Sequence, residues 1–156
     1  MRTVILEDTR EQIPWSFEIY GFEQERHKLQ TGDYIIKDSN YFVFERKRSS
    51  GELAINLGSK WKQFHEELKR MQDYVVPYII CEFPLEYLDT FPVNSGIPKY
   101  KWQYMKMNPF FLKKRLFESC EKYGIQVLFF NSSQEAQEEV YRIILEYQQR
   151  KSVVVS

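Results

Sequence analysis

A short β-hairpin with acidic residues at its open end is the feature that most constrains this chain. Two runs of β-forming residues, Tyr34–Ile36 and Tyr41–Phe44, flank the polar segment Lys37–Asn40. Asp, Ser and Asn side chains bond their own backbone in tight bends, so this segment predicts a turn. Because the two strands are expected to be antiparallel, Asp33 before the first and Glu45 after the second should lie side by side.

The residues around the hairpin's open end predict a particular chemistry. Side chains alternate along a strand, so Glu45 and Lys47 should share one face while Arg46 takes the other. Two adjacent carboxylates repel unless a cation lies between them, and Mg²⁺ prefers carboxylate oxygens and waters. A lysine beside the ion can hold its water or a phosphate as a point charge. Asp33, Glu45 and Lys47 therefore predict metal-dependent phosphodiester hydrolysis; the alternative is a surface hairpin with ordinary charges.

Two motifs in this order resemble the signature of the XPF/Mus-type (ERCC4-like) nucleases, a branch of the PD-(D/E)XK superfamily. One is Gly32-Asp33, a spacer and Glu45-Arg46-Lys47; the other is Asp8-Thr9-Arg10-Glu11, after the apolar run Thr3–Leu6. A helix containing Gln63 and a following apolar strand also match the order of elements in that family. The specific part of the resemblance covers residues 1–83.

The resemblance implies an α/β fold of the restriction-endonuclease type, a mixed sheet with helices on both faces in a single domain. It implies an Mg²⁺- or Mn²⁺-dependent endonuclease for flapped, forked or branched DNA, of the kind used in DNA repair and recombination. The catalytic residues it implies are Asp33, Glu45, Lys47 and Asp8, with the metal on Asp33, Glu45 and Asp8, and with Arg10, Glu11, Arg46 and Glu52 in support. Glu52 departs from the family pattern, which has an Asp one position earlier.

The order of elements along the chain independently favours an α/β sandwich. Apolar residues recur at helical spacing in Lys60–Met71, with Ser59 as the expected N-cap, and Asn108-Pro109 and Gly124 predict both ends of another helix. Charged residues 23–28 suggest a solvated face, and residues 48–58 suggest a loop with a helical turn at Glu52–Asn56. The expected domain is 1–150, followed by a tail at 151–156.

Composition narrows the class of protein without deciding its partner. The 156 residues are enough for one domain, and the 22 basic and 22 acidic residues give no net charge, which argues mildly against tight nonspecific DNA binding. Cys81 and Cys120 have no metal-type spacing and are expected to be buried thiols. Neither a signal peptide nor a membrane-spanning run is recognisable, which predicts an intracellular protein, in the cytoplasm of a microbe or virus-infected cell or in a eukaryotic nucleus, with no membrane or nucleotide cofactor.

A second region suggests contact with DNA. Between Lys99 and Lys106 basic and aromatic residues interleave, and no acidic residue occurs from Lys99 to Phe117. Positive charge attracts phosphates and exposed rings can stack on bases, but the same pattern also fits half-buried packing residues with lysines on the wet side. The candidate DNA contacts are Lys99, Lys101 and Trp102, together with Arg48, Lys60 and Lys62 near the hairpin.

Three functions remain open at this stage. DNA is the expected partner, and the resemblance implies a homodimer or a partner protein, since family members usually act as dimers. The main alternative to the nuclease is a catalytically inactive nuclease fold that binds DNA as a scaffold, because Glu52 departs from the pattern. The third is a nuclease for RNA or for free ends, because the motifs do not separate DNA from RNA.

Overall fold

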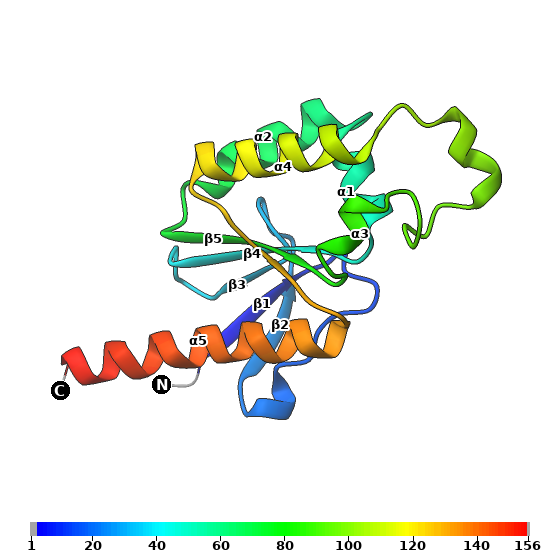
Figure 1. Cartoon of the computed structure of the whole chain (residues 1–156). Coiled ribbons are helices and arrows are strands. Elements are labelled where there is room, and N and C mark those ends of the chain that lie inside the picture. Colours follow the sequence, from blue (N-terminus) through cyan, green and yellow to red (C-terminus); the bar gives the residue numbers. More distant parts are fainter. Residues whose placement is uncertain (1–2, 156) are drawn as a thin grey trace.

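One mixed six-stranded sheet lies between two layers of helices (Figure 1). The computed structural model describes residues 3–155, with side chains to Ser152. Along the sheet the strand order is β2-β1-β3-β4-β5-β6. The strands are β1 Val4–Asp8, β2 Glu23–His27, β3 Tyr34–Ile36, β4 Phe42–Lys47, β5 Val76–Cys81 and β6 Gln126–Phe129.

After β4, strands and helices alternate along the chain, as expected for an α/β fold. Their bounds are α1 Ser50–Leu57, α2 Trp61–Met71, α3 Glu86–Asp89, α4 Pro109–Tyr123 and α5 Ser133–Val155, with 3₁₀ helices η1 Glu18–Tyr20 and η2 Lys99–Tyr104. In Figure 1, α1, α2, α3 and α4 cover one face of the sheet and α5 covers the other. The predicted fold class is confirmed. None of the described helices is long and apolar enough to cross a membrane.

The predicted hairpin is present and positions the acidic end. β3 and β4 are antiparallel, with Tyr34 opposite Phe44. The Asp33 backbone N–H donates to the Phe44 carbonyl at 2.8 Å, and the Asp33 carbonyl accepts from the Asp8 N–H at 2.8 Å. These bonds hold Asp33 between the ends of β1 and β4.

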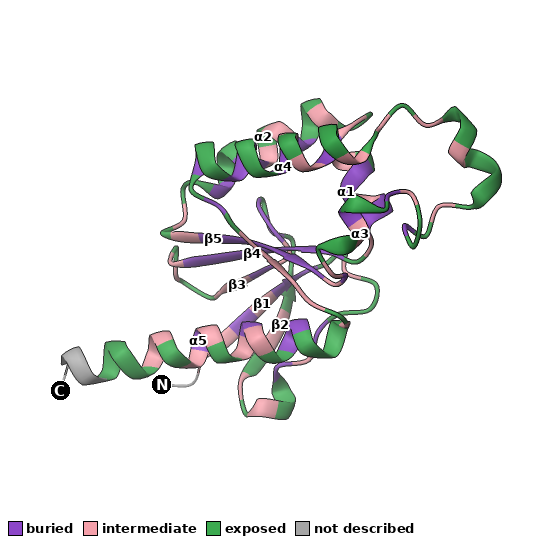
Figure 2. Ribbon diagram, viewed as in Figure 1, coloured by how far each residue is buried: buried purple, intermediate pink, exposed green. Residues whose placement is uncertain are grey.

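Alternation along β4 separates two hydrophobic cores. Val43 packs with Leu53, Phe64 and Leu112 under α1, α2 and α4. Its neighbours Phe42 and Phe44 pack on the opposite face, in the core that contains Trp15 and the buried residues of α5. Figure 2 shows the buried residues concentrated in the central strands and on the inner sides of the helices. Glu45 and Lys47 therefore face α1 and α2, and Arg46 faces α5.

Three local predictions differ from the structure. Residues 23–27, expected as a solvated face, form the edge strand β2, parallel to β1; charged side chains are common at sheet edges because one side of the strand meets water. The expected loop at 48–58 contains the eight-residue helix α1, capped by Ser49. Ser59 is not the N-cap of α2, which begins at Trp61 after Lys60 without a side-chain cap.

The C-terminal half agrees more closely. Asn108 Oδ1 accepts from the Phe111 N–H at 2.9 Å, and Gly124 ends α4 with φ +66°, in the left-handed region that favours glycine. Cys81 and Cys120 are buried free thiols, as predicted. Helix α5 is continuous past residue 150, so the proposed boundary of the tail does not coincide with a helix end.

Candidate active site

Glu45 and Lys47 form a buried ion pair at the end of β4. Lys47 Nζ donates to Glu45 Oε2 at 3.0 Å, and each side chain is 6% exposed. The ammonium also lies 4.8 Å from the centre of the Phe64 ring of α2. Burial lowers the pKa of Lys47, but Glu45 and Glu52 raise it more, so the net shift is upward and Lys47 stays positively charged.

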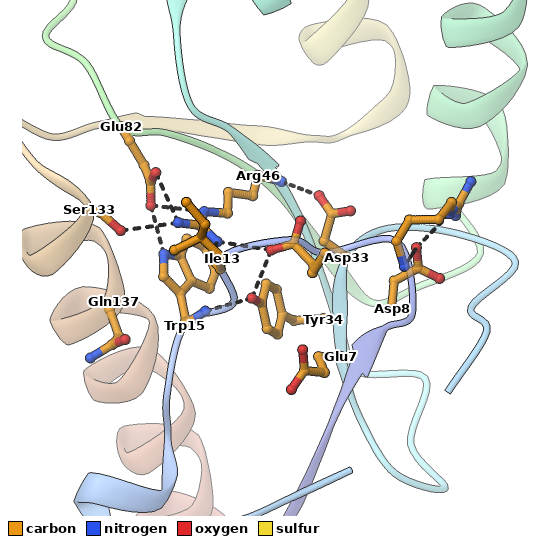
Figure 3. Close-up of polar contacts among 12 residues, drawn as sticks. Glu7, Asp8, Ile13, Trp15, Asp33, Tyr34, Arg46, Glu82, Ser133 and Gln137 are labelled. Atoms are coloured by element: carbon orange, nitrogen blue, oxygen red, sulfur yellow. Dashed lines mark hydrogen bonds and ion pairs between the residues drawn. The ribbon is translucent and has the colours of Figure 1, made fainter. Parts of the chain in front are cut away.

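Asp33 lies next to this pair and is held by the backbone of β4. Its Oδ2 accepts from the Arg46 N–H at 2.8 Å (Figure 3). Burial, and then the charge of Glu45, raise the pKa of Asp33 well above its usual value. The structure therefore brings Asp33, Glu45 and Lys47 together, as the hairpin geometry predicts.

Two further carboxylates, on α1 and α2, lie near this pair. Glu52 of α1 has its Oε1 3.8 Å from Lys47 Nζ, so an acid that comes one residue late still faces the lysine. Glu67 of α2 lies beside Glu45; burial and the charge of Glu45 raise the pKa of Glu67 to about 7. Sequence reasoning missed Glu67. The sequence did hold a clue: Glu67 comes three residues after the buried Phe64, so it lies beside the apolar face of α2.

The cluster has more negative than positive charge and an acceptor without a donor. Glu45 Oε1 is buried and has no hydrogen-bond partner. A buried polar atom without a partner requires an explanation. A bound cation is one, and the protonated carboxyl group of Glu67, which hydrogen-bonds Glu45, is another. Hard carboxylate oxygens from Asp33 and Glu45 fit Mg²⁺ or Mn²⁺ in type. Within residues 3–152, however, no three acidic, histidine or cysteine side chains already converge on one point as a metal-binding group.

Asp8 is buried near Asp33, and both of its carboxylate oxygens accept hydrogen bonds. Oδ1 accepts from the Leu29 N–H at 2.9 Å, and Oδ2 accepts from the Arg10 N–H at 3.2 Å and Nε at 2.5 Å. Although burial raises the pKa of Asp8, the bonds from Arg10 and Leu29 outweigh it and lower the net value. Asp8 therefore holds Arg10 and the segment before β3, and a metal at Oδ2 would have to displace Arg10.

Arg46 is at the centre of a buried network on the opposite face of the sheet (Figure 3). Its guanidinium bonds Glu11 at 2.9 Å and Glu82 at 3.0 Å. It also bonds Ser133 Oγ at 3.1 Å and lies 4.9 Å from the Trp15 ring. The network ties the segment after β1 to β4, β5 and α5. The predicted supporting residues Arg46 and Glu11 thus act on the side away from Glu45 and Lys47.

A groove of about 320 Å³ lies next to the carboxylate cluster, between α1 and α2. Its lining includes Glu52 and Glu67, the predicted DNA contact Lys60, and the amides of Asn56 and Gln63. Asn56 Oδ1 is buried there without a partner. The groove therefore offers polar atoms and one lysine at the side of the cluster.

The other predicted DNA contacts fall into two places. Arg48 and Lys62 are exposed, on the segments that follow β4 and begin α2. Lys99 and Lys101 are exposed on η2, in the long connection before α4. Trp102 of the same helix is half-buried, and its Nε1–H donates to the Ile97 carbonyl at 2.9 Å. Its ring is thus used largely within the segment itself.

Comparison with solved structures supports the fold. The chain is similar to XPF from Aeropyrum pernix, with a TM-score of 0.68 and 21% identity over 97% of this chain and 68% of that one. It is also similar to XPF from Aeropyrum pernix in complex with DNA, with a TM-score of 0.60 and 19% identity over 93% of this chain and 66% of that one. The chain thus spans about two thirds of the length of these structures.

Sequence comparison gives the family. No curated protein matches the chain significantly. The family model described as the ERCC4 domain matches residues 7–143, which include both motifs and nearly all of the sheet. The resemblance inferred from the two motifs is therefore confirmed, and the chain belongs to the ERCC4 domain family.

Proposed function

We propose that this protein is a divalent-metal-dependent endonuclease that hydrolyses DNA, with preference for flapped, forked or branched structures. The observation that carries the proposal is the buried Glu45–Lys47 pair beside Asp33, with one Glu45 oxygen left without a partner. A fold needs no such cluster for stability, because burying like charges costs free energy. Membership of the ERCC4 domain family supports the same function.

In this proposal Asp33 and Glu45 hold Mg²⁺ or Mn²⁺, and Asp8 serves as a further ligand if Arg10 releases it. A bound ion lowers the pKa of a water molecule and stabilises negative charge on the phosphate. Lys47 stays protonated, so it neutralises a phosphate oxygen or orients the attacking water and does not accept a proton. Glu45 orients Lys47 through their ion pair. Glu52 faces the same ammonium from α1 and limits its movement.

Exposed basic residues around the active site are the proposed contacts for DNA phosphates. We place Arg48, Lys60 and Lys62 on phosphates, because Lys60 lines the groove and Arg48 and Lys62 are exposed on the segments that precede α1 and begin α2. The XPF structure with DNA, a relative in fold, supports a nucleic-acid ligand. A homodimer or a partner protein belongs to the same proposal by family analogy.

The alternative function is a DNA-binding scaffold without catalysis. The bonds that occupy Asp8, and the absence among the described side chains of three converging metal ligands, favour it. The nuclease has the stronger support because Asp33, Glu45 and Lys47 are all present and in contact with one another or with the same backbone.

One assay separates the two functions. Labelled single-stranded, duplex, flapped and forked DNA would be incubated with Mg²⁺, Mn²⁺ or EDTA and with wild type, Glu45→Ala or the control Glu66→Ala. Glu66 lies on α2 but is exposed and pairs with Lys69 at 3.2 Å. Metal-dependent cutting that is lost only in Glu45→Ala supports the nuclease, and the preferred substrate gives its selectivity. DNA binding without cutting in every condition would make the protein a scaffold.

A further inference from the structure

Exposed aromatic side chains are confined to one segment of the protein. Within the described part of the chain, the exposed aromatic residues are Tyr100, Tyr104, Phe110, Phe111 and Phe117. Tyr100 is 71% exposed, Tyr104 75% and Phe110 76%. Rings are normally used for burial, so a patch of exposed rings usually marks a contact surface.

Tyr100 and Tyr104 lie on a projecting segment, residues 95–108, which we call the arm. The arm extends beyond the ends of α1 and α4 in Figure 1 and is mostly exposed in Figure 2. It is internally fixed: Trp102 Nε1–H donates to the Ile97 carbonyl at 2.9 Å, and the Trp102 carbonyl accepts from the Met105 N–H at 3.1 Å. Trp102 thus holds the arm together, while the two tyrosines remain in solvent.

The base of the arm is attached next to the active site. The Gly51 N–H at the start of α1 donates to the Ser95 carbonyl at 3.1 Å. A side chain at Gly51 would not fit there, because a Cβ atom would lie 2.4 Å from that carbonyl oxygen. The next residue is Glu52, which faces Lys47. The root of the arm is therefore attached one residue before a carboxylate of the cluster.

The charge of the surface identifies the kind of ligand. Lys99, Lys101 and Lys106 of the arm are exposed, and none of them forms an ion pair with a described carboxylate. Lys101 Nζ lies 5.8 Å from the centre of the Tyr100 ring. Free ammonium groups beside open rings match a phosphate backbone with accessible base faces. A duplex hides those faces by stacking, so the chemistry favours an unpaired strand over a duplex.

We propose that the arm binds an unpaired DNA strand, with Tyr100 and Tyr104 stacked on bases and Lys99 and Lys101 on phosphates. The choice of DNA rests on the proposed function; the choice of a single strand rests on the exposed rings. The proposal revises the expectation for Trp102, which serves as the internal support of the arm and not as its exposed ring.

The test is equilibrium binding in EDTA, where cleavage does not interfere. Fluorescence anisotropy would compare a labelled oligothymidylate of about 20 nucleotides, long enough for one binding site, with a duplex and with RNA of the same length. Tyr100→Ala/Tyr104→Ala should weaken binding of the single strand at least about tenfold, and leave the duplex unchanged. Lys99→Ala/Lys101→Ala should lower the salt slope on the single strand by about 1.4.

The matched control removes exposed apolar side chains elsewhere. Ile19 is 66% exposed and Val75 60%, so Ile19→Ala/Val75→Ala should bind all three ligands as the wild type does. Equal weakening of single strand and duplex by the tyrosine variant, or no weakening, would overturn the proposal. So would tighter binding of RNA than DNA, or a wild-type dimer that the tyrosine variant converts to monomer in sedimentation.

Failure of this proposal is distinguishable from failure of the nuclease. If the tyrosine variant binds normally while the wild type cuts DNA, only the arm proposal is refuted. If the arm binds the single strand as described but no DNA is cut with any metal, only the nuclease is refuted.

Discussion

Removing the charge of Glu67 should make the protein more stable above neutral pH. Glu67 lies beside Glu45, and the charge of Glu45 opposes ionisation of Glu67. Gln has the shape of the protonated acid and no charge, so Glu67→Gln keeps the packing of α2 and removes the repulsion. The expected cost is functional, since a cluster built for a cation loses one of its charges.

The magnitude follows from the pKa. Burial, and next the charge of Glu45, raise the pKa of Glu67 from 4.5 to about 7. A carboxyl group whose pKa is higher in the folded state contributes stability that is fully present below pH 4.5 and is lost as the pH rises through about 7. At 1.36 kcal/mol per unit of pKa, wild type loses about 3 kcal/mol between about pH 4 and pH 9 that Glu67→Gln keeps.

Urea unfolding from about pH 5 to pH 9 in EDTA, followed by circular dichroism, measures this difference. The free energy of unfolding of Glu67→Gln should exceed that of wild type by an amount that increases from pH 5 to pH 8. The control is Glu66→Gln, whose exposed side chain pairs with Lys69, and which should follow the wild-type pH dependence. Parallel curves for wild type and Glu67→Gln would refute the reasoning, because they would show that folding does not raise the pKa of Glu67.

The same unfolding experiment, repeated with Mn²⁺ in place of EDTA, tests whether a cation binds at the cluster. An ion held by Asp33 and Glu45 offsets the repulsion among the carboxylates, so Mn²⁺ should raise the stability of wild type most at high pH, where they are ionised. The gain from Glu67→Gln should then shrink. A pH dependence that Mn²⁺ leaves unchanged would contradict a metal at this cluster.

Three other substitutions test separate parts of the structure. Asp33→Asn should abolish cleavage while the circular dichroism spectrum and DNA affinity in EDTA stay near wild type; undiminished cutting would refute its role as ligand. Arg46→Ala should lower the free energy of unfolding by about 3 to 5 kcal/mol, because it removes the cationic partner of Glu11 and Glu82, whose side chains are only 13% and 6% exposed; a loss below about 1 kcal/mol in urea unfolding would contradict the network. Gly32→Ala should destabilise the hairpin, since Gly32 has φ +75° and a Cβ would lie 2.3 Å from Val43 Cγ2; an unchanged melting temperature would count against that geometry.

Much of the hairpin could be predicted because its determinants are local. The turn chemistry of residues 37–40 and the alternation along β4 define which side chains lie on one face. The same holds for α4, whose cap and terminal glycine are adjacent in sequence to its ends. Alternation correctly separated Arg46 from Glu45 and Lys47, and membership of the ERCC4 domain family could be identified from two short motifs.

The elements that sequence reasoning missed depend on partners distant in the chain. β2 is a strand because it pairs with β1, although its own residues are charged. Helix α1 is short; its cap Ser49 is a local signal, but the burial of Leu53, Ala54 and Leu57 that stabilises its turns depends on distant partners. The position of Glu67 in the cluster could not be predicted, because it depends on contact with β4, about twenty residues earlier in the chain. The spacing of apolar residues shows which face of α2 is buried, but it does not show that Glu67, at the border of that face, lies beside Glu45.

The three consecutive residues Glu45, Arg46 and Lys47 combine two opposite tasks in one strand. Arg46 gains full ionic partners and helps to fasten α5 and the segment after β1 to the sheet. Glu45, one residue earlier, is left with an unpartnered oxygen among other carboxylates. The Arg46 network has a donor for each of its carboxylates, whereas the neighbouring cluster keeps an oxygen without one. Alternation along β4 lets one strand carry both, with the hydrogen-bonded Arg46 network facing α5 and the candidate active site facing α1 and α2.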